Sequence, residues 1–333
     1  MRTTLTTLLL ALLCGSARAD GPLEVYFIDV EGGQATLFVS PSGETMLVDT
    51  GWPGANSRDA ERIVSAARLA GVKQIDYLVV THYHMDHVGG VPQLAARIPV
   101  HTFVDHGPDV EHGAEADRLF AAYKNVSEKS KHLLAKPGEM IPIRGIKVQI
   151  LTAAGEEISR PLVGGGAPNP LCAGAKRKEP DPSENAQSVG MLITYGKFRM
   201  IDLGDLTWNK ELGLACPDNK IGTIDAYLST HHGLDQSSAP PLVHALHPLV
   251  AIMNNGARKG GSIEAWQTMH TSPGLEDIWQ LHYAFEAGKA NNAPEDFIAN
   301  PEEHCQGNWI KLSAEPDGHF TLTNGRNGKT KTY

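Results

Sequence analysis

The pattern of hydrophobic and polar positions predicts short strands first and strand–helix–strand units after them. Residues 23–29, 35–39 and 45–48 are expected to form three strands joined by tight turns, an antiparallel beginning. Helical apolar spacing over 59–70 is followed by a buried strand over 75–80. A helix between two parallel strands implies a right-handed crossover. The ends of these strands are therefore expected to meet at one edge of a sheet.

The rest of the chain continues this mixture. We expect further elements over these ranges: helices at 91–97, 110–135 and 275–287, and strands at 100–104, 146–151, 188–194, 198–202, 224–229, 249–253, 309–313 and 319–323. Two halves, each with strands followed by a helix, fit an α/β fold of four layers. The polar helix at 110–135 is interpreted as an insertion. Residues 20–333 are expected to form one domain with insertions near 108–137 and 155–187.

A dense cluster of chemical groups follows the strand at 75–80. His82, His84, Asp86 and His87 form an H-x-H-x-D-H pattern. His82 and His84 point the same way if strand geometry continues, because alternate residues share a face. Nitrogen and oxygen donors in one short loop suit a borderline metal such as zinc. A histidine-rich surface loop without a metal is the alternative.

The first residues predict export. One positive charge, an apolar stretch over 5–13 and the small residues Ala17 and Ala19 are typical of a signal peptide cleaved before Asp20. We therefore expect residues 1–19 to be removed and the protein to be secreted or periplasmic, without a membrane span. Cys14 raises a lipoprotein alternative, although Leu13 before it is larger than such a site prefers.

Charge and cysteine content narrow the picture further. The chain has 29 Lys and Arg against 38 Asp and Glu, so its surface gives no electrostatic help in gathering nucleic acid, although a locally positive site could still bind it. Cys172, Cys216 and Cys305 remain after cleavage. One disulfide and one free thiol are possible in an oxidising compartment, and the sequence leaves the pairing open.

Four motifs now stand in order along the chain. They are Asp49 after a strand, the H-x-H-x-D-H pattern, Asp205 in Leu-Gly-Asp, and the doublet His231-His232 before a glycine. This set resembles the metallo-β-lactamase fold superfamily. The segment 27–30 and the histidine doublet look most like the hydrolase domain of DNA-uptake competence proteins. The resemblance implies a four-layer αββα sandwich with one or two metals between the sheets.

Two positions depart from the superfamily pattern. Gln34 stands where the competence-type turn usually has an acidic residue. A third-motif histidine is missing about twenty residues before Asp205, where Asn185 or Ser188 stands instead. Either His106 or Asn185 could replace it, although a structural role is the simpler interpretation of His106.

The resemblance also implies a role for each motif residue. The implied metal ligands are His82 and His84 for one ion, Asp86 and His87 for a second, Asp205 as the bridge, and His232 to complete the second site. His231 is the alternative to His232, and otherwise a general acid or substrate contact. Asp86 and His231 are the expected catalytic residues, and Asp49 is expected to hold a ligand histidine. Two zinc ions are expected, with manganese or iron as alternatives.

These observations predict an exported metal-dependent hydrolase. The expected reaction is hydrolysis of a phosphodiester or related ester by a metal-activated hydroxide. A lactone or β-lactam hydrolase on the same site is one alternative, and a non-catalytic metal-binding protein is another. The expected partner is a small molecule, and nucleic acid is not excluded.

Overall fold

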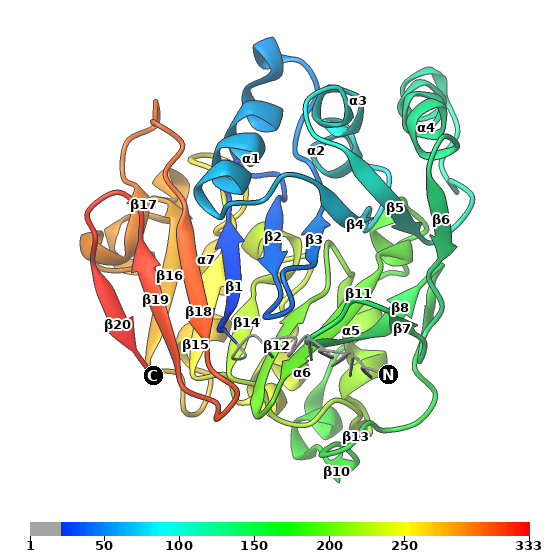
Figure 1. Ribbon diagram of the computed structural model, residues 1–333. Helices are drawn as coiled ribbons and strands as arrows, with labels where there is room; N and C mark the ends of the chain where they lie inside the picture. The colour runs from blue at the N-terminus through cyan, green and yellow to red at the C-terminus, as the bar shows by residue number, and fades with distance from the viewer. Residues whose placement is uncertain (1–20) are drawn as a thin grey trace, which may run out of the picture.

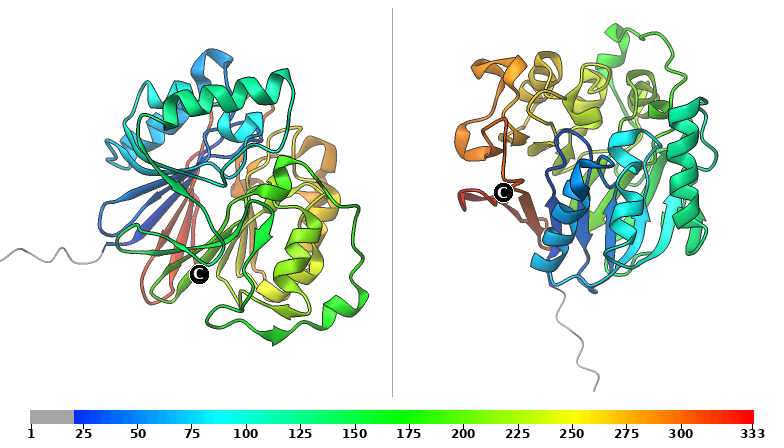
Figure 2. Two further views of the ribbon diagram at one scale, coloured as in Figure 1. Left: turned by 90° about the vertical axis from the view of Figure 1, so that its right-hand side faces the viewer. Right: turned by 90° about the horizontal axis from the view of Figure 1, so that it is seen from above.

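The computed structural model describes residues 21–333, so the predicted signal peptide 1–19, Cys14 and Asp20 lie outside the described residues. Two large β-sheets pack face to face, and helices cover the outer side of each (Figure 1; Figure 2). This arrangement is the predicted four-layer αββα sandwich. Over residues 21–333, no helix combines the length and the apolar character needed to cross a membrane.

The first sheet has the order β20-β19-β18-β1-β2-β3-β4-β5-β6, running across the front of Figure 1. Its strands are β1 (Leu23–Phe27), β2 (Thr36–Val39), β3 (Thr45–Val48), β4 (Ile75–Val79), β5 (Val100–Asp105), β6 (Lys131–Leu134), β18 (Ile310–Ala314), β19 (Phe320–Asn324) and β20 (Thr330–Thr332). The helices of this half are α1 (Arg58–Leu69), α2 (Met85–Val88), α3 (Val91–Ala95) and α4 (Ala114–Ser127). The strands β3, β4, β5 and β6 run parallel, as the predicted crossovers require.

The second sheet has the order β17-β16-β15-β14-β12-β11-β8-β7, and β9 pairs with β8. Its strands are β7 (Met140–Ile141), β8 (Lys147–Ala153), β9 (Glu156–Glu157), β11 (Gly190–Tyr195), β12 (Phe198–Asp202), β14 (Ala226–Leu228), β15 (Val250–Met253), β16 (Asp277–His282) and β17 (Ile298–Asn300). The covering helices are α5 (Trp208–Ala215), α6 (Pro240–Leu246) and α7 (Ile263–His270). Two short strands, β10 (Ala167–Pro168) and β13 (Asp218–Asn219), pair separately.

Short 3₁₀ turns complete the connections. They are η1 (Ala55–Ser57), η2 (Pro170–Gly174), η3 (Glu184–Gln187), η4 (Thr230–Gly233), η5 (Phe285–Ala287), η6 (Lys289–Asn291) and η7 (Glu295–Phe297). Two of them, η3 and η4, border the site described below.

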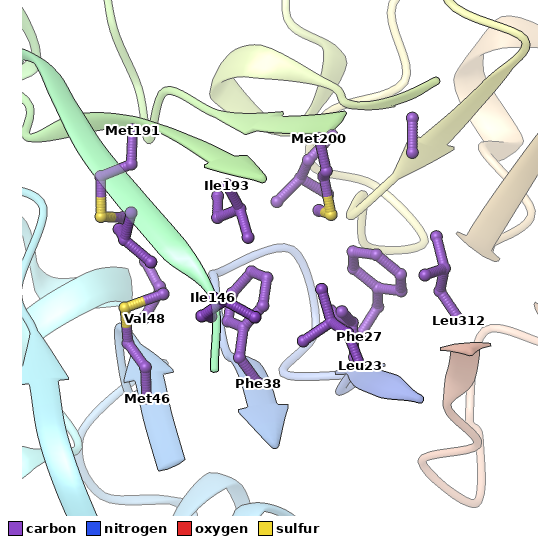
Figure 3. Close-up of a cluster of buried hydrophobic side chains, with 14 of the residues drawn as sticks. Leu23, Phe27, Phe38, Met46, Val48, Ile146, Met191, Ile193, Met200 and Leu312 are labelled. Carbon is purple, nitrogen blue, oxygen red and sulfur yellow. The ribbon is translucent and has the colours of Figure 1, made fainter. Parts of the chain in front are cut away.

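The core between the sheets forms because alternate residues of each strand face inward. Leu23 and Phe27 of β1 pack there against residues such as Met200 and Leu312 (Figure 3), whereas Tyr26 faces the helices on the outside. Burying one such large apolar side chain stabilises the fold by about 1.5–3 kcal/mol. The sandwich therefore holds its loops on a rigid frame.

The expected helix at 275–287 is wrong. The segment contains β16, a strand buried on both faces: Ile278 joins the outer core, while Trp279 and Leu281 join the core between the sheets. A strand apolar on both faces lacks the alternation that separates strands from helices. The helix of this region is α7, which begins at Ile263.

The expected helix at 110–135 is corrected, whereas the two insertions themselves stay a prediction. The range 110–135 is not one helix, because α4 is followed by β6, which pairs with β5 and extends the first sheet. The range 155–187 contains only short elements, and a disulfide joins its Cys172 to Cys216 at the end of α5. Cys305 is the free cysteine of the described chain. The one-disulfide, one-thiol expectation is therefore confirmed.

Candidate metal centre

The loop after β4 carries the H-x-H-x-D-H residues. His82 Nε2 lies 3.1 Å from His84 Nδ1, so these two nitrogens converge. The short helix α2 then begins, with the amide of His87 donating to the carbonyl of His84 at 3.0 Å. This turn folds Asp86 and His87 back over the loop, as predicted. His82 and His87 are fully buried.

The second sheet supplies the remaining groups from the ends of β12 and β14. Asp205 Oδ2 lies 3.2 Å from His87 Nε2 and 4.0 Å from His82 Nε2. His232 Nε2 lies 3.2 Å from Asp86 Oδ2 and 3.3 Å from Asp205 Oδ1. Asp205 thus stands between the groups of the two sheets.

One compact set consists of Asp86, His87, Asp205 and His232, which we name the catalytic cluster after the role that the sequence predicts for it. One ligand atom from each lies within 4.8 Å of those from the other three, and all four residues are buried. His231 lies outside this set, with its Nε2 3.3 Å from Asp205 Oδ2. Of the doublet, His232 therefore has the position of a ligand.

The buried acids of the catalytic cluster favour a positively charged group or ion beside them. Burial alone would lower the pKa of His87, but Asp205, Asp86 and Asp49 together raise it well above its usual value. Burial would raise the pKa of Asp205, yet His232, His87 and His231 hold it well below its usual range. The buried Asp205 Oδ1 accepts no hydrogen bond. Nitrogen and carboxylate donors with a spare oxygen fit a divalent metal such as zinc.

Asp49 contacts His87, one of the histidines predicted to be a metal ligand. Its Oδ2 lies 2.7 Å from His87 Nδ1 and also accepts from the hydroxyl of Thr81 at 2.7 Å. Its Oδ1 accepts from the amide of Thr81 at 2.8 Å. Such an acceptor fixes the ring orientation of a ligating histidine, leaving Nε2 to face the centre.

Two acidic residues missed in the sequence tie the insertions to the metal loop. Glu111 Oε1 lies 3.0 Å from His84 Nε2. The buried Glu184 accepts from the amide of Tyr83 at 3.0 Å and from that of Val110 at 2.8 Å. It also lies 2.8 Å from His106 Nε2, so His106 is held by Glu184 rather than by the catalytic cluster. Both acids contact residues that are distant in the sequence, so no local sequence pattern predicts these contacts.

Lys259 is a further residue that the sequence did not single out. Its ammonium forms an ion pair with Asp86, lies 5.0 Å from the Trp52 ring centroid, and keeps 32% of its side chain exposed. The neighbouring Gly260 permits this approach, because a Cβ there would come within 2.2 Å of the carbonyl oxygen of His232. A cationic group therefore stands at the mouth of the centre.

The two departures from the superfamily pattern have physical counterparts. Gln34 Nε2 donates to both oxygens of Asp202 at 3.0 and 2.9 Å, and burial raises the pKa of Asp202 to about 6. An acidic residue at position 34 would face that carboxylate. At the position of the missing histidine, Asn185 Oδ1 is buried without a hydrogen-bond partner, and Ser188 Oγ accepts from the amide of Asp205 at 3.3 Å. Neither supplies an imidazole.

Residues 28–173 match the sequence profile of the Metallo-beta-lactamase superfamily. The match covers a little under half of the chain, and this part, which includes Asp49 and the H-x-H-x-D-H loop, is similar to the metallo-β-lactamase superfamily. Members of the metallo-β-lactamase superfamily are generally metal-dependent hydrolases that bind divalent metals. The coarse functional class expected from the motifs is thus that of the superfamily.

Two curated proteins and one solved structure illustrate what this chain is similar to. The chain is 24% identical to Recombination protein 2 of Haemophilus influenzae over 235 residues, covering 70% of this chain and 24% of that one. It is 25% identical to an atrochrysone carboxyl ACP thioesterase of Cryptosporiopsis over 123 residues, covering 37% and 32%. The chain thus spans about a third or less of these curated relatives. The metallo-beta-lactamase fold protein YhfI of Bacillus subtilis aligns with a TM-score of 0.46 at 13% identity, covering 78% and 96%.

Proposed function

We propose that this protein is an exported metal-dependent hydrolase of small anionic esters, with a phosphodiester as the favoured substrate. The proposed ligands are His82, His84, Asp86, His87, Asp205 and His232. The observation that carries the proposal is the catalytic cluster, in which donors from both sheets converge. A structural zinc site is usually closed and four-coordinate, whereas further donors lie beside this cluster and its mouth is open to Lys259.

Divalent ions at such a centre supply a Lewis acid and an activated water. The chain supplies orientation and proton transfer. Asp49 holds His87, and His231 stands at the edge of the centre with its Nδ1 3.4 Å from Ser237 Oγ. We propose that His231 protonates the leaving oxygen of the substrate.

The feature beside the centre that favours an anionic substrate is the ammonium of Lys259, which pairs with Asp86. The neighbouring pocket of about 490 Å³ is lined by His84 and by the acids Asp86, Glu111 and Glu115, so its own charge does not attract an anion. With Asp86 acting as a metal ligand, the ammonium of Lys259 becomes available to an anionic oxygen of the substrate. A phosphodiester carries such an oxygen in its ground state, and a lactone does not.

Acyl substrates are the second candidate. The similarity to a thioesterase favours them, and the lactone and β-lactam alternatives belong to the same acyl-transfer class. A panel separates the two classes: bis-p-nitrophenyl phosphate, a lactone, a cephalosporin and an acyl thioester, each offered to zinc-loaded and manganese-loaded protein. Much faster turnover of an acyl substrate than of any phosphodiester would contradict the proposed reaction class.

The role of His231 is tested by His231→Ala. We expect bound metal to be retained and the rate to fall by about 10²–10⁴-fold, the range for losing a general acid. The loss should be smaller for substrates with a p-nitrophenol leaving group, which hardly needs protonation. His319→Ala, at an exposed turn, is the matched control. Equal losses for good and poor leaving groups would remove the proton-donor assignment.

Export is proposed from the signal-peptide pattern and from the disulfide. A Cys172–Cys216 bond persists most readily in an oxidising compartment. Mass spectrometry of protein collected outside the cytoplasm should give Asp20 as the first residue. A lipid-modified Cys14 at the terminus would instead show a membrane-anchored protein.

A further inference from the structure

A second group of metal-ligand side chains lies outside the catalytic cluster. Asp29, Glu31, His282 and Cys305 each place one ligand atom within 4.8 Å of those from the other three. Asp29 and Glu31 follow β1, His282 ends β16, and Cys305 lies between β17 and β18. Asp29 and His282 are fully buried. Three distant segments of the chain thus bring oxygen, nitrogen and sulfur donors to one point.

We propose that these four residues, the Cys305 group, bind one zinc-like divalent metal in a structural site. A thiol and an imidazole favour a borderline metal over magnesium or calcium, which prefer oxygen alone. Four protein donors are the number that a closed tetrahedral zinc site uses. The metal would join the turn after β1 to the segment that precedes β18.

The distances suit this geometry. His282 Nε2 lies 2.8 Å from Asp29 Oδ1 and 3.6 Å from Glu31 Oε2. Cys305 Sγ lies 3.0 Å from Asp29 Oδ2, 3.3 Å from Glu31 Oε1 and 3.8 Å from His282 Nε2. Ligands bound to tetrahedral zinc at their usual bond lengths stand about 3.3–3.8 Å apart. Cys305 contacts the carboxylate oxygens that Arg62 also bonds, so in a bound site the thiol would turn toward Asp29 Oδ1 and Glu31 Oε2.

Arg62 is the resident cation of this group. Its Nη1 donates to Asp29 Oδ2 at 2.8 Å and to Glu31 Oε1 at 3.1 Å, and its Nη2 lies 3.4 Å from Cys305 Sγ. The other oxygen of each carboxylate, Oδ1 and Oε2, faces His282 instead. Arg62 can therefore remain bonded to one oxygen of each acid while the other binds metal, as outer partners of metal ligands do. The competing interpretation is that Arg62, together with Arg58 at 3.9 Å from Glu31 Oε1, balances the acids and no metal binds.

A catalytic interpretation of Cys305 fits less well. Burial and the nearby Asp29 raise the pKa of the Cys305 thiol to about 12, whereas a nucleophilic cysteine needs a lowered pKa. The nitrogen of His282 that faces the thiol also contacts Asp29 at 2.8 Å, so it is not reserved as a base for sulfur. The donor set is better suited to coordination.

The Cys305 group is connected to the catalytic cluster through the turn at residues 29–34. The turn that begins at Asp29 continues to Gln34, whose amide donates to the carbonyl of Asp86 at 3.1 Å. Gly33 packs so closely that a Cβ there would come within 2.4 Å of that same oxygen. A metal at the Cys305 group would therefore fix the turn on which the metal loop rests.

Cobalt substitution provides a specific test, because the catalytic cluster contains no sulfur. Mature protein with the Cys172–Cys216 disulfide intact is loaded with Co²⁺ and its near-ultraviolet absorption is recorded. We expect a thiolate-to-cobalt charge-transfer band in the native protein and in His84→Ala, and none in Cys305→Ser. Zinc content of Cys305→Ser should be one ion per chain below that of the native protein, and His319→Ala should show no loss.

The outcomes separate the alternatives. Absence of the band from native protein at saturating cobalt, or full zinc content in Cys305→Ser, would overturn the proposal and leave the acids balanced by arginine alone. A second measurement needs no variant: iodoacetamide should label Cys305 slowly in zinc-loaded protein and several-fold faster after chelation. Equal labelling rates would likewise count against a metal at this group. Loss of the band in Cys305→Ser with hydrolytic activity retained would support metal binding at the Cys305 group. It would also leave the proposed hydrolase function standing.

Discussion

The catalytic cluster and the Cys305 group differ in how the charge of their acids is balanced. In the catalytic cluster, the buried Asp86 and Asp205 face imidazoles and one lysine that is about a third exposed. In the Cys305 group, a guanidinium bonds to both carboxylates. A buried charge is costly unless it is paired and hydrogen-bonded. The catalytic cluster is thus built to receive a cation, whereas the Cys305 group is stable before any metal arrives.

The largest effect is expected at Asp205, the carboxylate proposed to bridge two metals. Asp205→Asn keeps the shape but removes the charge between the two sets of ligands, so we expect loss of bound metal and a fall in hydrolysis of about 10³-fold or more. His84→Ala should behave similarly while the protein stays folded. Metal analysis and turnover of bis-p-nitrophenyl phosphate provide the measurements, with the exposed Asp317→Asn as the control. Full metal content and activity in either variant would refute the assignment.

The next effect concerns Arg62 and is one of stability. In chelator, Arg62→Met should lower the free energy of unfolding by about 3–5 kcal/mol, because it leaves the buried Asp29 without its arginine partner. Added zinc should recover part of this loss if the Cys305 group binds metal. Arg97→Met, which breaks the exposed pair with Glu61, should cost at most about 1 kcal/mol. Denaturant unfolding is the measurement, and equal losses in both variants would contradict the comparison.

The loss of stability in Arg62→Met should become smaller as the pH falls. Burial alone would raise the pKa of Asp29, but the hydrogen bond and charge of His282 and the charge of Arg62 lower it below its usual value. Its stabilising contribution is therefore present above the unfolded pKa and is lost as pH falls through the folded pKa. Arg62→Met removes one of these lowering effects. The stability gap to the native protein should therefore narrow toward acid pH, and a widening gap would disprove the account.

A smaller effect on metal binding is expected at Asp49, which contacts His87 on the side away from the centre. Asp49→Asn should weaken metal binding or activity by about 10–100-fold, because the amide orients the His87 ring less firmly than the carboxylate. Competition with a chelator of known affinity measures the change. An unchanged metal affinity would show that Asp49 serves only the backbone of Thr81.

The smallest effect distinguishes substrates. Lys259→Met should raise KM for an anionic phosphodiester by about tenfold, the value of one charge-assisted contact, with little change in kcat. Hydrolysis of a neutral p-nitrophenyl ester should be unaffected. Arg258→Met is the matched control, because Arg258 is the preceding cation in the chain and pairs with the exposed Glu303. Equal changes for charged and neutral substrates would argue against direct recognition.

The sequence predicted the parts of the site that are local. The H-x-H-x-D-H loop was predictable because a strand, a turn and four donors are adjacent in the chain, and Asp49 because it ends the neighbouring strand. Lys259 was not, because its contact with Asp86 depends on how the loop after β15 crosses to the other sheet. His282 was left without a role for the same reason: its strand, β16, was interpreted as part of a helix.

Glu111 and Glu184 have a consequence for how new substrate specificities could arise in this protein. The insertion at 108–137 lines the pocket beside His84, and each insertion is anchored through its own acid to the loop that holds the proposed metal ligands. Randomising 155–187 in a directed-evolution library would therefore perturb Tyr83 and its neighbours unless Glu184 were kept. A change in the shape of either insertion is therefore coupled to the geometry of the metal loop. Successful libraries should keep Glu111 and Glu184 and vary the other loop residues of the two insertions.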